Sequence, residues 1–209
     1  TAISAKSMSG AMFHMERFIH IYDYLKKRKD DYRFVVSTDV RDVIFQKDPM
    51  EYLSHIITRN SGYELIGVSE CIKIKDEHWN RDNILKCFGP YFYEDVKDYE
   101  VLNVGTLAGL SHVVCDLCGM LYQLSMNRAD WVADQAAYNI LIQLNHFRRD
   151  KVVFVKQEKG LATQLGTVWA KRNELPILEP TPIFKDGRFY TQNGKEFSIV
   201  HQYDRDPIV

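Results

Sequence analysis

The sequence lacks the features that place a chain in a membrane or on a nucleic acid. None of its 209 residues lies in an unbroken apolar run of the ~20 residues that a membrane-spanning helix needs. Lysine and arginine together number 27 and aspartate and glutamate 28, so the net charge is -1. The chain therefore has no excess of basic residues that would indicate binding to nucleic acid. Repeats and low-complexity segments are missing as well. The remaining composition, 45% apolar and 26% charged, is that of a globular domain with a sizeable core.

Cysteine is scarce, and the sequon for asparagine-linked glycosylation does not occur. Both absences favour a reducing compartment over a secretory one, so we expect a cytoplasmic protein. Two of the four cysteines, Cys115 and Cys118, have the spacing of a redox or zinc motif. They lie within an apolar helical pattern and no second such pair is close, so buried structural thiols are the favoured interpretation.

The most informative stretch begins as an apolar strand and then carries two carboxylates. Residues 34–36 are apolar and rich in β-branched side chains, which predicts a buried strand. Asp39 and Asp42 follow, and a second apolar run begins directly after them. Carboxylates between apolar runs are costly to bury unless they are paired or bind a cation. We therefore predict an Mg²⁺ or Mn²⁺ site at a strand end, the alternative being that Asp39 caps a turn and Asp42 pairs with Arg41.

A second set of polar groups lies near the end of the chain. His201 directly follows the apolar run at 197–200, and Arg205 lies four residues further on. Imidazole together with carboxylates is a ligand set that Mn²⁺ accepts, and a guanidinium suits a phosphate. His201 is thus a predicted metal ligand and Arg205 a predicted phosphate-binding residue. The alternatives are a hydrogen-bonded surface histidine and a solvated charge.

Two more stretches place polar groups in apolar surroundings. Asn103 and Gly105 lie in an otherwise apolar strand, where an amide and a glycine favour the close approach of a ligand or another backbone. Asp134 and Gln135 lie near the start of an apolar helix, where an aspartate can also act as a cap. Each pair alone is a weak indication of a site.

Strands alternate with helices along the chain, which is typical of an α/β fold. Helices are expected at 11–28, 49–57, 111–126 and 131–147, and strands at 34–38, 64–69, 101–110 and 152–155. A hairpin across Asn193 and Gly194 is expected to pair 188–191 with 197–200, which makes the C-terminal part antiparallel. Residues 70–100, rich in charge and aromatic side chains, are expected to be irregular.

Taken together, these stretches resemble the GT-A glycosyltransferases, in particular retaining, metal-dependent families with the motif order of glycogenin. The matching blocks are 17–25, 38–45, 103–105, 134–135 and His201, in that order. In such enzymes an Asp-x-Asp motif after a central strand binds metal and nucleotide, and a C-terminal histidine completes the metal shell. The chain also resembles, more narrowly, the capsid glycosyltransferases of chlorella viruses, which would place it in a host cytoplasm.

This resemblance implies a fold, a reaction and a set of ligands. The fold would be a GT-A-like mixed, mainly parallel central sheet flanked by helices, in a single catalytic domain over residues 1–209. The reaction would be transfer of a sugar, with retention, from a nucleotide-diphosphate donor such as a UDP-sugar to a hydroxyl of a glycan or protein-linked glycan. The implied roles are Mn²⁺ or Mg²⁺ binding by Asp39, Asp42 and His201, donor binding by Asp39, Arg41, Asn103, Gly105 and Arg205, and contacts at the reacting sugar by Asp134 and Gln135.

Two features depart from the family pattern. The motif here is Asp-x-x-Asp, so if Asp42 matches the second aspartate, Val40 occupies the place of the first and Asp39 acts from one residue earlier. The 38 residues before Asp39 show no clear strand, so the N-terminal nucleotide-binding strand is expected to be reduced or lost. The segment at 70–100 would form an acceptor-side wall or lid, with a packed surface loop as the alternative.

Two other functions stay open at this point. Metal-dependent phosphoesterases and nucleotidyltransferases also use paired carboxylates, but they need further clustered ligands, of which the sequence offers few. An inactive carbohydrate-binding or scaffold domain would keep the fold and fail to bind a divalent metal.

Overall fold

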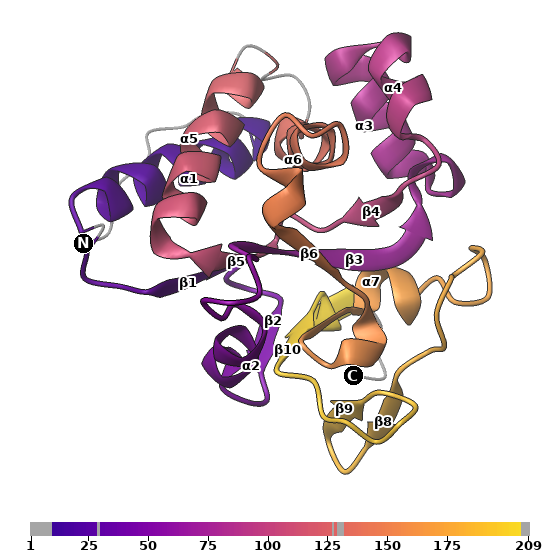
Figure 1. Ribbon diagram of the computed structural model, residues 1–209. Helices are drawn as coiled ribbons and strands as arrows, with labels where there is room; N and C mark the ends of the chain where they lie inside the picture. Colours follow the sequence, from indigo (N-terminus) through magenta and orange to yellow (C-terminus); the bar gives the residue numbers. More distant parts are fainter. Residues whose placement is uncertain (1–9, 29, 127, 129–131, 206–209) are drawn as a thin grey trace.

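A mixed central sheet with helices on one face and a smaller sheet on the other makes up the protein (Figure 1). The computed structural model describes residues 10–28, 30–126, 128 and 132–205. The helices are α1 (Gly10–Lys26), α2 (Pro49–Ile56), α3 (His78–Phe88), α4 (Pro90–Val96), α5 (Ser111–Met126), α6 (Ala133–Gln143) and α7 (Leu165–Val168). Short 3₁₀ helices are η1 (Ile74–Asp76), η2 (Arg149–Lys151), η3 (Gln157–Lys159) and η4 (Tyr203–Arg205). The strands are β1 (Phe34–Thr38), β2 (Val43–Phe45), β3 (Leu65–Lys73), β4 (Glu100–Leu102), β5 (Thr106–Leu110), β6 (Val152–Val155), β7 (Ala162–Gln164), β8 (Ile183–Lys185), β9 (Arg188–Tyr190) and β10 (Ile199–His201).

The central sheet has the order β1-β5-β3-β4, with β6 paired to β3. The α/β class that the sequence predicts is confirmed. The mainly parallel sheet is not seen among the described strands, because β1–β5, β5–β3 and β3–β4 are antiparallel and only β6 runs parallel to β3. Alternation of strands with helices does not fix strand direction when the connections between strands are long and include further elements.

The strand predicted at 101–110 is interrupted. β4 and β5 both pair antiparallel with β3, and the turn between them contains Asn103 and Gly105. The backbone N–H of Asn103 donates to the carbonyl of Val68, and the carbonyl of Gly105 accepts from Asp39. These bonds keep the interrupted strand aligned with both neighbours while the turn carries polar groups out of the sheet.

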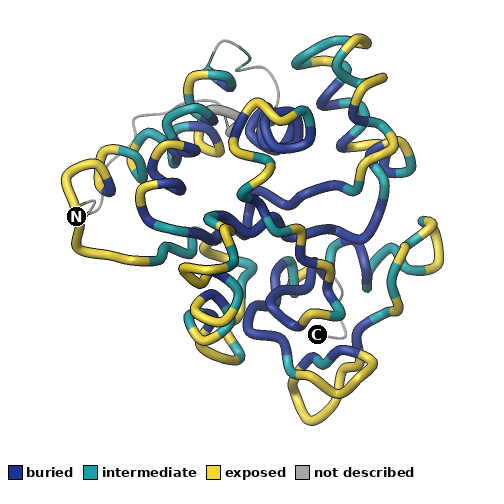
Figure 2. The backbone as a smooth tube through the Cα atoms, in the orientation of Figure 1, coloured by how far each residue is buried: buried dark blue, intermediate teal, exposed yellow. Residues whose placement is uncertain are grey.

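The two faces of the sheet pack against different elements because adjacent side chains of a strand point to opposite sides. Leu65 packs with Phe18 of α1, Leu117 of α5 and Leu141 of α6, whereas the next residue, Ile66, packs on the other face with a second cluster. Figure 2 shows the resulting burial of the central strands and α6. Both faces of β3 are therefore covered, which matches the buried strand expected at 64–69.

The smaller sheet, of order β2-β10-β7, brings distant parts of the chain together. β10 pairs antiparallel with β2 and parallel with β7. The hairpin predicted between 188–191 and 197–200 differs from this arrangement, because β9 pairs with β8 and β10 joins the smaller sheet. The turn across Asn193 and Gly194 is nevertheless closed by the bridge between Tyr190 and Glu196 and by bonds from Phe197 N–H to the carbonyl of Phe189 and from Thr191 N–H to that of Lys195. The C-terminal part is thus antiparallel in β8–β9 and mixed in the smaller sheet.

The sequence pattern predicts that residues 70–100 are irregular, and this prediction is wrong. The segment is largely helical, in α3 and α4. Their aromatic side chains Phe88, Phe92 and Tyr93 pack against a buried cluster that includes Ile72 and Ala136. Gly89, with φ of 86°, ends α3 and lets Pro90 begin α4 without a gap. Core packing therefore explains these three rings of the segment.

The cysteines are free, and three of the four are buried. Burial raises the pKa of Cys71 and Cys118 to about 12, so neither thiol ionises readily near neutral pH. Cys115 and Cys118 lie on α5 in the main core cluster. The prediction of buried structural thiols is therefore confirmed for these two residues.

Candidate functional site

A polar pocket of about 570 Å³ opens where the central and smaller sheets meet. It lies beside the end of β1, the turn between β4 and β5, the start of α6 and the end of β10. The predicted site residues that line it are Asp39, Asp42, Asn103, Gly105, Asp134, Gln135, His201 and Arg205. Arg41 does not line the pocket: its side chain is exposed, and its backbone carbonyl accepts a hydrogen bond from Tyr203.

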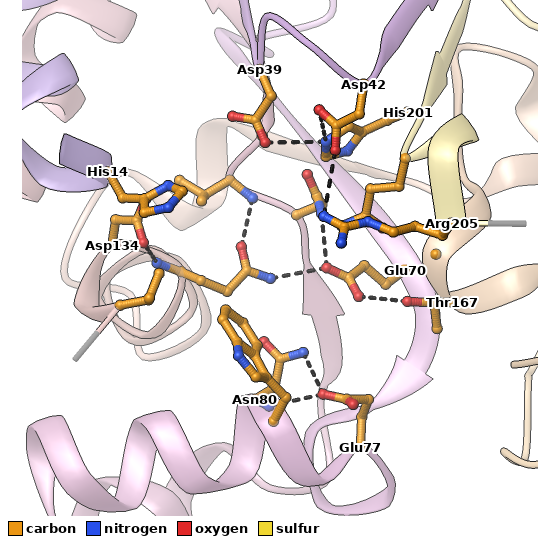
Figure 3. Close-up of a pocket in the computed structure, with 18 of the residues that line it drawn as sticks. His14, Asp39, Asp42, Glu70, Glu77, Asn80, Asp134, Thr167, His201 and Arg205 are labelled. Atoms are coloured by element: carbon orange, nitrogen blue, oxygen red, sulfur yellow. Dashed lines mark hydrogen bonds and ion pairs between the residues drawn. The ribbon is translucent and has the colours of Figure 1, made fainter. Parts of the chain in front are cut away.

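Asp39, Asp42 and His201 converge at one end of this pocket (Figure 3). Asp39 directly follows β1, and Asp42 directly precedes β2. His201 is the last residue of β10 and lies opposite Val43 of β2. Its Nε2 atom is 3.1 Å from Asp39 Oδ2 and 3.8 Å from Asp42 Oδ1. The strand pairing therefore joins residues that are 162 positions apart in the chain.

The donor set of this cluster suits a hard or borderline divalent cation. One ligand atom from each of the three residues lies within 4.8 Å of the others, and no other such group of acidic, histidine or cysteine residues occurs in the described chain. Two carboxylates and an imidazole are ligands that Mn²⁺ accepts, and the carboxylates suit Mg²⁺. Burial opposes ionisation of Asp39, but the hydrogen bond with His201 and the charge of Arg17 outweigh it and hold the pKa of Asp39 below its usual value.

A chain of hydrogen bonds sets the tautomer of His201. Glu70, as a carboxylate, accepts from Asn103 Nδ2 at 2.8 Å, so the amide oxygen of Asn103 faces the hydroxyl of Thr106 at 3.5 Å. The hydroxyl donates to that oxygen and accepts from Gln164 Nε2 at 3.0 Å. The oxygen of Gln164 therefore accepts from Nδ1 of His201, at 2.6 Å.

The consequence of this chain is that Nε2 of His201 faces the two carboxylates, where it either donates a proton to Asp39 as an imidazolium or presents a lone pair to a cation. Three acceptors that point at one another repel unless a proton or a cation lies between them. A buried histidine whose Nδ1–H is held by an oxygen has the tautomer and orientation of a metal ligand. The residues present thus fit the cation that the sequence predicts.

Gln164 lies at the end of β7, directly opposite His201 in the parallel pair β7–β10, and it is buried. Gln164→Met is expected to lower the affinity for Mn²⁺ by ~10–100-fold, because the imidazole loses the acceptor that orients it. Titration calorimetry with MnCl₂ measures this effect. Gln143→Met is the matched control, since Gln143 is also buried and donates to the carbonyl of Glu100 outside the pocket. Equal affinities in the two variants would contradict an orienting role.

Gly105 lies close to two side chains of the cluster, where the sequence predicts the close approach of a ligand or another backbone. A Cβ atom at this position would lie 2.6 Å from Cε1 of His201 and 2.8 Å from Oδ2 of Asp39. Gly105→Ala is therefore expected to displace one of these ligands, to destabilise the fold by ~1–3 kcal/mol and to weaken Mn²⁺ binding at least about tenfold. Gly67→Ala on β3, where the nearest atom would lie at 3.4 Å, should leave Mn²⁺ binding unchanged.

Arg17 on α1 joins two of the predicted site carboxylates. Its guanidinium forms an ion pair with Asp39 Oδ1, and its Nη2 lies 3.0 Å from Asp134 Oδ2. Asp134 is buried, and its other oxygen accepts from the backbone N–H of Gln135. Burial raises the pKa of Asp134, and the charge of Arg17 offsets part of that rise. Both oxygens of Asp134 thus have partners, which hold the carboxylate in place as the partner of Arg17.

Gln135 and Glu70 also line the pocket and are hydrogen-bonded to each other. The oxygen of Gln135 accepts from the backbone N–H of Val104, and its Nε2 donates to Glu70 Oε1 at 3.0 Å. The other oxygen of Glu70 accepts from the hydroxyl of Thr167. Burial raises the pKa of Glu70, and the hydrogen bonds from Asn103 and Thr167 act against that rise.

Arg17, Glu70 and Gln164 are parts of the site that sequence reasoning missed. Glu70 had a detectable signal, because it follows an apolar strand just as Asp39 does, but the strand was expected to end at Ser69. Arg17 lies on an amphipathic helix, where a solvated charge is the ordinary expectation. Gln164 is a neutral residue whose role depends on its partner in a neighbouring strand.

Comparison with known proteins adds no identification. No protein-family model matches the chain, and no curated protein matches it significantly. Within the described residues, no helix is both long and apolar enough to cross a membrane.

Proposed function

We propose that the chain is a metal-dependent glycosyltransferase that moves a sugar from a nucleotide-diphosphate donor, in the first instance a UDP-sugar, to a hydroxyl acceptor. The single observation that carries this proposal is the pocket itself. One cavity is lined by residues from five separate stretches, which follow the order expected for retaining GT-A enzymes. Three of these residues, Asp39, Asp42 and His201, converge as a cation-binding set. The mainly antiparallel pairing of the central sheet does not by itself identify a GT-A fold, so the support comes from the site.

Positive groups surround the cluster where a diphosphate would lie. Arg205 Nη2 is 3.7 Å from Asp42 Oδ2 and the side chain is 57% exposed, so the guanidinium is available to a phosphate. Arg17 is the second guanidinium at this end. A bound Mn²⁺ or Mg²⁺ would add the positive charge that stabilises a leaving diphosphate.

The other lining residues suit the sugar. Asn103 and Gln135 present amide groups whose positions are fixed by Glu70, and such preorganised groups bind hydroxyls without reorganisation. During transfer the bond between the anomeric carbon and the diphosphate oxygen breaks, and the acceptor oxygen forms the new bond to that carbon. The proton of the acceptor hydroxyl leaves with the diphosphate. In a single displacement, retention requires the acceptor to approach from the face that the diphosphate leaves.

Thermal unfolding with UDP and MnCl₂ tests the proposal. UDP is expected to raise the unfolding midpoint only when Mn²⁺ is present, because without a cation the carboxylates of Asp39 and Asp42 would repel its phosphates. Stabilisation by neither Mn²⁺ nor UDP would overturn the proposal. Stabilisation by Mn²⁺ together with hydrolysis of simple phosphate esters would support a phosphoesterase in its place.

A further inference from the structure

The two ends of the pocket differ in chemistry. Figure 3 shows Asp39, Asp42 and His201 at one end, Glu77 and Asn80 at the other, and Glu70 between them. The first end has two arginines that are also paired with carboxylates, but its cation-binding set would add the positive charge of a divalent ion. At the far end Lys171 Nζ lies 3.1 Å from Glu77 Oε1, so the two charges cancel. The far end therefore offers no surplus positive charge to a phosphate and suits a neutral ligand.

Glu77 is held ready for such a ligand. It caps the N-terminus of α3, is 2% exposed, and its Oε2 accepts from both the backbone N–H and the Nδ2 of Asn80, at 2.8 and 2.9 Å. Its Oε1 accepts from Lys171, and a carboxylate oxygen can accept two hydrogen bonds. Lys171 carries three N–H groups in turn. An acceptor and a donor side by side match sugar hydroxyls, each of which can donate and accept.

Trp79 gives this end an apolar surface. It lines the pocket and is 43% exposed, although three other aromatic side chains of the same segment, Phe88, Phe92 and Tyr93, pack against the core. A large aromatic ring beside a few fixed polar groups is the usual composition of a small-molecule site. The indole pairs an apolar face with a polar edge, as the C–H face and hydroxyl rim of a pyranose require.

We propose that Trp79, Glu77 and Lys171 form the acceptor subsite, and that it takes a pyranose ring of a glycan. The indole lies against the C–H face of the ring, and Glu77 and Lys171 bind its hydroxyls. The role of this subsite as the acceptor site rests on the proposed transferase function, whereas the binding of a neutral sugar rests on the pocket alone. The indole face together with a paired acceptor and donor favours a pyranose over a lone peptide hydroxyl.

Saturation-transfer NMR tests this subsite on the wild-type chain without nucleotide. The probes are the methyl α- and β-glycosides of glucose, galactose, mannose, xylose and rhamnose. At least one is expected to receive saturation, most strongly on the C–H protons of one ring face. Trp79→Ala is expected to weaken that binding about tenfold or more. Trp79→Phe, which keeps an aromatic face, should retain part of it.

Tyr91→Ala is the matched control, because Tyr91 is a 76% exposed aromatic residue of α4 outside the pocket. Saturation of no glycoside, or equal saturation in wild type and Trp79→Ala, would overturn the subsite. Binding of UDP with Mn²⁺ is measured on the same samples and should survive Trp79→Ala. If wild type fails to bind UDP but binds a glycoside through Trp79, the transferase function falls while the sugar site stands.

Discussion

Asp42→Asn is expected to abolish the Mn²⁺-dependent binding of UDP. The substitution removes one of three converging ligands and keeps the shape of the side chain. Affinity for Mn²⁺ should fall by more than about 100-fold, beyond the ~10–100-fold typical of residues that only orient a ligand. Titration calorimetry of Mn²⁺ into the variant, and of UDP in the presence of Mn²⁺, measures both losses.

The fold should tolerate this change. Asp42 is paired with Arg205 at 3.7 Å, and that guanidinium is 57% exposed, so the loss of the pair costs little stability. Asp31→Asn is the matched control, since Asp31 is exposed and lies outside the pocket. Retention of Mn²⁺-dependent UDP binding in Asp42→Asn would show that Asp42 is not a ligand.

Arg17→Leu is expected to destabilise the protein strongly. It leaves two carboxylates, Asp39 and the buried Asp134, without their shared guanidinium. Removing one partner of a buried ion pair costs ~3–5 kcal/mol, and we expect the lower end because the Arg17 side chain is 25% exposed. For a chain of this length the melting midpoint should fall by ~6–12 °C.

A second substitution tests the cause of this loss. Arg17→Leu combined with Asp134→Asn should recover much of the stability, since the more deeply buried of the two carboxylates that lose their partner is then neutral. The deficit of Arg17→Leu should also shrink as the pH falls towards ~4. Without Arg17 the folded pKa of Asp134 lies further above its unfolded value, so protonation relieves the penalty at low pH. A pH-independent deficit, or no recovery in the double variant, would point to lost packing of the arginine stem.

The parts of the site that could be predicted share a local signal. Asp39 and Gly105 interrupt apolar strands, and each interruption is visible in a few consecutive residues. Arg17 begins a block of the family resemblance, but its partners lie 22 and 117 positions away, so the residues beside it do not reveal its role. Gln164 likewise acts only through its register with His201.

The same difference between local and long-range signals separates the parts of the fold that could be predicted from those that could not. The strand at Phe34 and the helix that Pro49 begins were predictable, because β-branched runs and a proline in the first helical turn act locally. In α2 the side chain of Asp48 also accepts from the backbone N–H of Met50. Strand direction in the central sheet, and the partners of β10, depend on pairings between distant segments that no short pattern encodes.

The most direct test of the central claim is slow hydrolysis of nucleotide sugars without an acceptor. Wild type is incubated with UDP- and GDP-linked sugars and dTDP-rhamnose in MnCl₂, and release of the nucleoside diphosphate is followed by chromatography. One donor is expected to be hydrolysed, and a chelator or Asp42→Asn should stop the reaction. Release of no nucleoside diphosphate from any donor, under conditions where Mn²⁺ binds, would contradict a glycosyltransferase.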